Sequence, residues 1–139
     1  MAKIPLNTTG PHNSEVIPQM MSEVVEARLA NVQHQTDMAI AHLQRAVSLE
    51  DTLDYAEPPD WLAPTRESLG AALLIAGKAA QAEAVFREDL KRNARNPRSL
   101  FGLAETLRVE GKSAEAAAVQ QQFLRAWRKA DRKLMLSDL

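Results

Sequence analysis

The chain has 139 residues, of which 45% are hydrophobic and only 4% aromatic, and its formal net charge is −1. This length suits one domain, and the near-neutral charge argues against a global attraction to nucleic acid or an anionic membrane. The absence of cysteine excludes disulfides and thiolate metal sites. Because neither a signal peptide nor an apolar stretch of membrane-spanning length is visible, we expect a cytoplasmic protein with no membrane partner.

Residues 1–15 are predicted to form a disordered arm, because the first thirteen are rich in Pro, Thr, Asn and Gly and have no period. A helix is expected to start near Pro18, with this proline in its first turn. Apolar residues at helical spacing then predict two helices within residues 20–53, separated by a break near Gln33–Asp37. We interpret residues 20–53 as a degenerate copy of the repeat described below, with Ala27, Ala39 and Leu43 as its core positions.

Residues 54–62 form an insert with the sequence Asp-Tyr-Ala-Glu-Pro-Pro-Asp-Trp-Leu. Its two consecutive prolines are incompatible with helix and predict an extended path. Tyr55 and Trp61 either fold back over the gap between repeats or contribute to a ligand site, since loops carried on a rigid scaffold often bind.

The region from Ala63 to Ala130 repeats itself with a period of 34 residues. Two units, residues 63–96 and 97–130, each predict a helix, a break at a glycine (Gly77 or Gly111) and a second helix. Small residues recur where helices must approach closely. The matched pairs are Leu69 and Leu103, Gly70 and Ala104, Leu73 and Leu107, Gly77 and Gly111, Ala82 and Ala116, and Val85 and Val119.

This pattern, with Pro97 at the junction of the two units, resembles the tetratricopeptide repeat. The resemblance implies an all-α fold: a right-handed α-solenoid of about three helix–turn–helix units. A similar acidic Pro-Pro-Trp insert occurs in bacterial repeat proteins of this type, and no biochemical role comes with it. A two-helix unit cannot bury its apolar face alone, so neighbouring units are expected to stack.

After the second unit, Phe123, Trp127, Ala130 and Leu134 keep helical spacing. They predict that the last helix continues through the tail, residues 131–139, as an extended capping helix. Basic side chains give this end a polar outer face, and the alternative is that they bind RNA or an acidic partner. These residues are Arg125, Arg128, Lys129, Arg132 and Lys133.

Signs of catalysis are missing. His12, His34 and His42 do not have the i, i+4 spacing of a helical metal site. The glycines are dispersed rather than gathered in a phosphate loop, and no nucleophile–base spacing stands out. The expectation is a non-enzyme without cofactor or metal.

The resemblance implies that the first helix of each unit lines a concave groove that binds a partner peptide. Phe101 among charged neighbours has the composition of an interaction hot spot. The predicted partner-binding residues are Arg28, Asn31, Glu67, Ala71, Leu74, Arg98, Phe101, Glu105 and Arg108, with Tyr55 and Trp61 of the insert.

Three hypotheses follow for function. The first is a non-catalytic scaffold that binds a protein or peptide in a preorganised groove. The second is a homodimeric module that covers an open apolar end with a second copy. The third, nucleic-acid binding through the basic C-terminal helix, predicts an affinity that falls steeply with salt.

Overall fold

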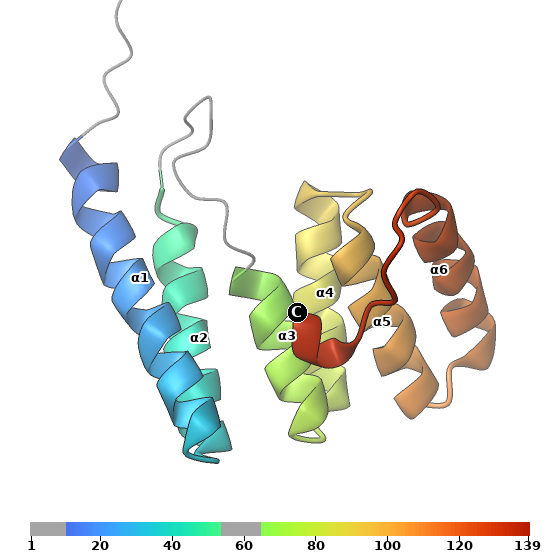
Figure 1. Ribbon diagram of the computed structural model, residues 1–139, viewed down its shortest axis with the longest axis horizontal. Coiled ribbons are helices and arrows are strands. Elements are labelled where there is room, and N and C mark those ends of the chain that lie inside the picture. Colours follow the sequence, from blue (N-terminus) through green and yellow to red (C-terminus); the bar gives the residue numbers. More distant parts are fainter. Residues whose placement is uncertain (1–10, 54–64) are drawn as a thin grey trace, which may run out of the picture. The chain divides into compact units, whose positions relative to one another are not determined.

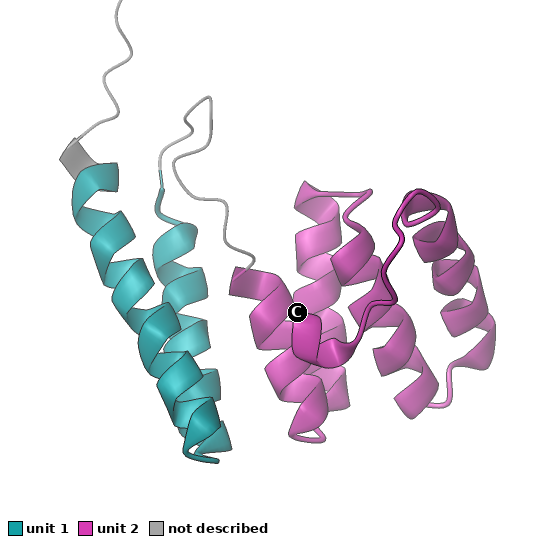
Figure 2. Cartoon of the chain, in the orientation of Figure 1, with its two compact units in different colours: residues 1–63 teal, residues 64–139 magenta. Residues whose placement is uncertain are grey.

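The computed structural model describes residues 11–53 and 65–139, in which all regular structure is helical. Figure 1 shows the elements, and the predicted all-α class is confirmed for this part of the chain. The chain divides into two compact units, Met1–Ala63 and Pro64–Leu139 (Figure 2). The helices are α1 (Pro11–Val32), α2 (Thr36–Glu50), α3 (Thr65–Ile75), α4 (Ala79–Arg92), α5 (Pro97–Val109) and α6 (Ser113–Ala126), followed by the 3-10 helix η1 (Leu136–Asp138).

Unit 1 contains the α1–α2 pair, and α1 is longer than the sequence predicts. It begins at Pro11, so residues 11–15, assigned to the disordered arm, are helical, and Pro18 lies inside the helix rather than in its first turn. Proline at the first helical position removes no intrahelical hydrogen bond, which makes Pro11 a good start. Burial of Val16 and Met20 gives the added turns apolar contacts. The first ten residues lie outside the described part.

The core positions predicted for residues 20–53 are buried. Ala27 on α1 and Ala39 on α2 are at most 1% exposed, and Leu43 is 4% exposed. Their counterparts in unit 2, Gly70, Ala82 and Phe86, are buried as well. The first helix pair therefore uses small and apolar residues at the same relative positions as the second.

In each of the three helix pairs, the two helices are connected by a turn of the same geometry. The residue before the last of each hydrogen-bonded loop has a left-handed backbone, with φ of 59° at His34, 77° at Gly77 and 76° at Gly111. The next amide in each case donates to a carbonyl five residues back: Gln35 to Ala30, Lys78 to Leu73 and Lys112 to Leu107, at 2.8–2.9 Å. This is the Schellman arrangement that ends helices.

The centre of unit 2 is the ring of Phe86, which is fully buried. It packs against Gly70 of α3 and Gly102 of α5 so closely that a Cβ built at Gly70 would lie 2.5 Å from the ring. A Cβ at Gly102 would lie closer still. The two glycines therefore make room for one aromatic ring between the helix pairs α3–α4 and α5–α6.

The predicted extended capping helix is wrong. Helix α6 ends at Ala126, and residues 130–139, called here the return segment, fold back over α5 toward α3 (Figure 1). The Trp127 indole Nε1 donates to the Arg132 carbonyl at 2.7 Å and holds the bend. Leu134 becomes 6% exposed against Leu100 and Phe123. Folding back buries this leucine, which a continued helix would carry beyond the end of the unit.

Candidate functional site

A polar network joins α3, α4 and α5 at the start of α5. Asn96 caps this helix, because its side-chain oxygen accepts from the Arg98 amide at 3.1 Å. Its Nδ2 donates to Glu67 at 2.6 Å and to Asp89 at 2.8 Å. The Ser99 hydroxyl also donates to Asp89, at 2.6 Å. Both carboxylates are largely buried and hydrogen-bonded, as buried charges must be.

Arg98 links this network to the return segment. Its Nε donates to Glu67 Oε2 at 2.5 Å, and its second terminal nitrogen donates to the Asp138 carbonyl. The hydroxyl of Ser68, on α3, donates to the main-chain oxygen of Leu139 at 2.7 Å. One side chain of α3 and one of α5 thus donate hydrogen bonds to main-chain oxygens of the return segment.

The apolar part of the same face lies between α5 and α6. The rings of Phe101 and Phe123 are 5.4 Å apart and tilted by 52°, and Trp127 stacks on Phe123 at 5.9 Å. Leu134 lies in this cluster, and Leu139 packs partly buried against it. Offset aromatic pairs of this kind add stability beyond the area that they bury. We call the surface formed by Ser68, Arg98, Phe101 and Phe123 the α3–α5 face.

The return segment stabilises its own shape through Asp138. Its carboxylate accepts from the Met135 amide at 2.8 Å and pairs with Arg132 at 2.6 Å. These contacts close the turn that contains η1. Asp138 therefore presents its main-chain carbonyl to Arg98 while its side chain is used within the segment.

The predicted groove residues are only partly brought together. Glu67, Ala71 and Leu74 are buried, with 4–7% of their surface exposed. Arg98, Phe101 and Glu105 are half-buried, and exposed Arg108 bonds Glu105 and Gln120. Of the remaining four residues, Arg28 and Asn31 are exposed on α1 of unit 1, and Tyr55 and Trp61 lie outside the described residues.

Several residues of this region were not predicted as site residues: Ser68 of the face, Asn96 at the start of α5, and Leu134 and Leu139 of the return segment. Ser68 and Asn96 have no counterpart in the 34-residue period, so comparing the two units does not single them out. Leu134 was assigned to a helix. A signal was present for Asn96, because Asn followed by Pro is a strong start for a helix.

Charge pairing organises the outer surface of α4. Glu83 accepts from Lys112 and from Arg87, both at 2.6 Å. These two hydrogen bonds, that from Lys112 first, lower the pKa of Glu83 to about 2. The hydrogen bond to Glu83 likewise raises the pKa of Lys112. Glu83 is therefore ionised throughout the neutral range and ties α4 to the turn before α6.

In unit 1, Glu23 of α1 pairs with two basic side chains, as Glu83 does in unit 2. Its carboxylate lies 2.7 Å from His42 Nδ1 and 2.9 Å from Arg45 Nε, both on α2. Burial acts to raise the pKa of Glu23, but the hydrogen bonds from His42 and Arg45 outweigh it, and the pKa is lowered. These polar contacts of Glu23 connect α1 to α2.

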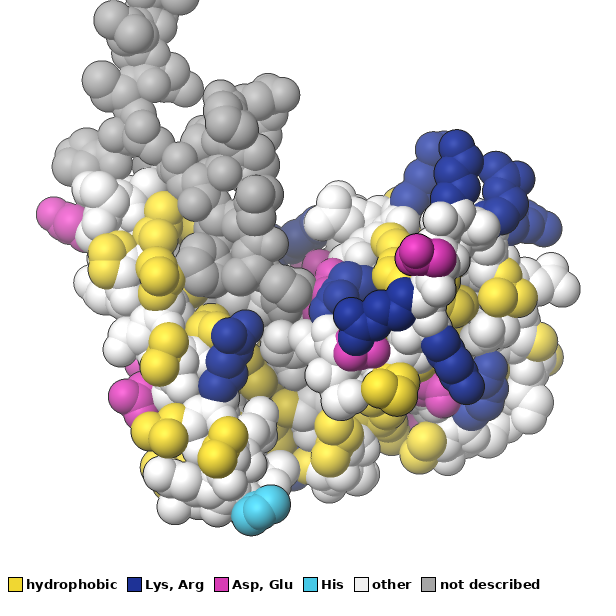
Figure 3. Space-filling model, in the orientation of Figure 1, with side chains coloured by type: hydrophobic (Ala, Val, Ile, Leu, Met, Phe, Trp, Pro, Cys, Tyr) yellow, Lys and Arg dark blue, Asp and Glu magenta, His cyan; other side chains and the backbone are white. Residues whose placement is uncertain are grey.

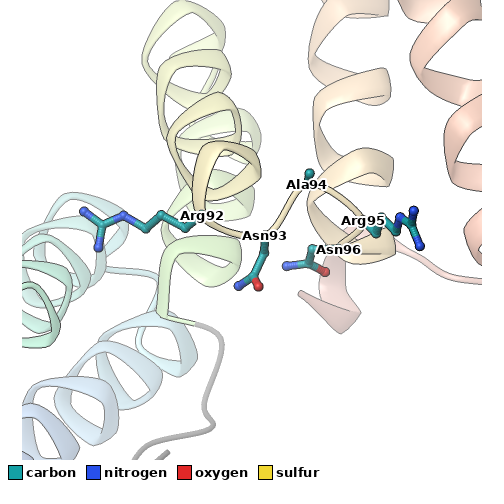
Figure 4. Close-up of a pocket in the computed structure, with 5 residues that line it drawn as sticks. All are labelled: Arg92, Asn93, Ala94, Arg95 and Asn96. Atoms are coloured by element: carbon teal, nitrogen blue, oxygen red, sulfur yellow. The ribbon is translucent and has the colours of Figure 1, made fainter. Parts of the chain in front are cut away.

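The described residues contain no cluster of candidate metal ligands. No group of three or more His, Asp or Glu gathers there as ligands would. A hollow at the α4–α5 connection is lined by Arg92, Asn93, Ala94, Arg95 and Asn96 (Figure 4). Arg92 and Arg95 point to opposite sides of it, so the two cations do not converge on one anion. Among the described helices, none has the length and apolar character needed to cross a bilayer.

Basic side chains gather where α6 ends and the chain turns back (Figure 3). Arg125, Arg128, Lys129 and Lys133 are exposed, whereas Arg132 pairs with Asp138. These residues surround a bend and an extended segment instead of covering the outer face of a capping helix. Comparison with protein-family models and with curated proteins finds no match to this chain.

Proposed function

We propose that this protein is a non-catalytic interaction module that binds an extended segment of a partner protein on its α3–α5 face. Its architecture would be that of a short tetratricopeptide-like solenoid. The three turns of equal geometry support this architecture, because His34, Gly77 and Gly111 recur in corresponding places of three helix pairs. So do the buried small residues at the helix contacts, such as Ala39, Ala82 and Ala116.

One observation carries the functional proposal: the α3–α5 face already holds a peptide segment. Residues 134–139 lie on it through two main-chain oxygens and two leucine side chains. Main-chain recognition together with apolar contacts is how peptide-binding surfaces generally work. A rigid helical face also spares ordering entropy on binding.

Selection from a random displayed peptide library tests this proposal. The wild-type chain should enrich a set of peptides that an Arg98→Ala/Phe101→Ala/Arg108→Ala variant does not retain. A matched control, Lys91→Ala/Arg95→Ala/Leu124→Ala, also removes two cations and one apolar side chain, all of them exposed and none among the four residues that define this face. The control should retain the wild-type set.

Helical content and thermal unfolding of all three chains, measured by circular dichroism, establish that each is folded at the selection temperature. Equal enrichment by wild type and by the α3–α5 variant would contradict the proposed face. Enrichment of no peptide by any chain would contradict peptide binding itself.

A second candidate is self-association, which a row of exposed apolar side chains on α1 favours. Met21, Val25 and Leu29 are 49–60% exposed and lie four residues apart, so they share one face of the helix. Light scattering after size exclusion should then show a dimer that a Val25→Glu change converts to a monomer. If the wild type is still a monomer at about 0.1 mM, a concentration on the order of the dissociation constant of a weak dimer, this candidate is excluded.

A further inference from the structure

We propose that the return segment is a built-in competitor of the α3–α5 face, and that the partner segment displacing it has the same chemistry. This inference rests on the proposed function. The partner is a short protein segment with two aliphatic side chains five residues apart, joined by one turn that leaves its last main-chain oxygens free to accept hydrogen bonds.

The α3–α5 face recognises little of the segment's own sequence. Arg98 and Ser68 contact main-chain oxygens, which any peptide offers. Selectivity comes from the apolar positions, where Leu134 is 6% exposed and Leu139 is half-buried. An aliphatic side chain at each of these two positions would make the same contacts.

The return segment does not complete a helix and is held at few points. Between the bend and η1 it has no regular structure, and Met135 is 56% exposed beside buried Leu134. Arg98 has a second partner in Glu67, at 2.5 Å, so its charge stays paired when the segment leaves. The face can therefore exchange one occupant for another without an unpaired buried charge.

The bend at Trp127 sets the strength of the competition. Only residues 128–131 separate it from Arg132, whose carbonyl accepts from the Trp127 indole. A segment tethered this closely has an effective concentration in the millimolar range, so it lowers the apparent affinity for a separate peptide. Releasing the segment should raise that affinity about tenfold or more.

The test uses the full chain with Leu134→Asp, which places a charge in the apolar cluster, and Met135→Asp as the matched control. The probe is a fluorescein-labelled peptide with the sequence of residues 132–139, followed by anisotropy. The Leu134→Asp chain should bind it at least about tenfold more tightly than wild type. The Met135→Asp chain should behave like wild type, and a probe with Asp at its first leucine should bind none of them.

Release of the segment is measured independently by the NMR signal of the Trp127 indole N–H, which should move in Leu134→Asp and stay in Met135→Asp. A moved indole signal without a gain in probe affinity would overturn the competitor inference, and so would an unmoved one. If Leu134→Asp does not fold, Leu134→Ala takes its place with the same two readouts. A further outcome is that library peptides bind the wild type while Leu134→Asp shows neither a gain in probe affinity nor a moved indole signal. That result would contradict the competitor inference alone and would leave the proposed function supported.

Discussion

Phe86 and Gly102 are in direct contact across the junction of the two helix pairs of unit 2. A Cβ at position 102 would come closer to the phenylalanine ring than real Cβ atoms come to other atoms. The glycine also lies in the middle of α5, where it lowers helix propensity. Its presence there is therefore explained by packing and not by any conformational need of the helix.

Replacing Gly102 with Ala should destabilise the protein by about 1–3 kcal/mol, because overpacking outweighs the gain in helix propensity. Urea unfolding followed by circular dichroism measures the change. In a Phe86→Leu background, whose smaller side chain leaves space, the same substitution should be nearly neutral. Equal costs in both backgrounds would show that the ring is not what excludes a side chain at this position.

His34 and Gly111 allow a direct comparison of left-handed turn positions. His34 adopts φ 59° without being glycine, so His34→Gly should stabilise unit 1 by about 0.5–1 kcal/mol. Gly111→Ala should cost about 1 kcal/mol, although a Cβ there would meet no atom within 4 Å. Thermal unfolding of the two variants should shift in opposite directions. A shift of the same sign would contradict the common turn geometry.

Arg98 and Glu67 form an ion pair in which the Glu67 side chain is 8% exposed and the Arg98 side chain 32%. Arg98→Ala should cost about 2 kcal/mol, because it leaves a mostly buried charge without its cation. Adding Glu67→Gln to that chain should restore part of the loss, since a neutral amide needs no counter-charge. Urea unfolding of wild type, both single variants and the double variant gives the coupling. Strict additivity would argue that the pair contributes nothing.

Glu83 should make stability depend on pH in the acid range. Its folded pKa of about 2 lies below its ordinary value of 4.5, so its contribution is complete above pH 4.5 and is lost as the pH falls toward 2. Glu83→Gln should therefore lower stability at pH 6 and have little effect near pH 2. Urea midpoints across this range test the difference, with exposed Asp131→Asn as the control. A constant difference between wild type and Glu83→Gln would contradict the assignment.

The helix pairs of this fold can be predicted from the spacing of apolar residues and glycines in the sequence. Leu69, Leu73 and their partners 34 residues on mark the buried faces, and glycine at 77 and 111 marks the turns. The same offset logic located Ala27 and Ala39 in the first pair. These features are local, because each depends on residues within one or two helical turns.

The return segment could not be predicted in this way. Leu134 keeps helical spacing with Phe123 and Trp127, and it does contact Phe123, but by folding back. Spacing shows that a residue belongs to an apolar surface and does not show by which path the chain reaches it. The network around Asn96 was missed because its partners, Glu67 and Arg98, belong to different repeats, and only their packing brings them together.

The shared ring of Phe86 has a consequence for how unit 2 comes apart. Because Gly70 of α3 and Gly102 of α5 both pack against the same Phe86 ring, neither helix pair has a complete interior by itself. Fraying from one end cannot stop at the junction, so we expect the four helices to melt in one all-or-none step. Amide exchange should accordingly give α3 and α5 the same opening free energy.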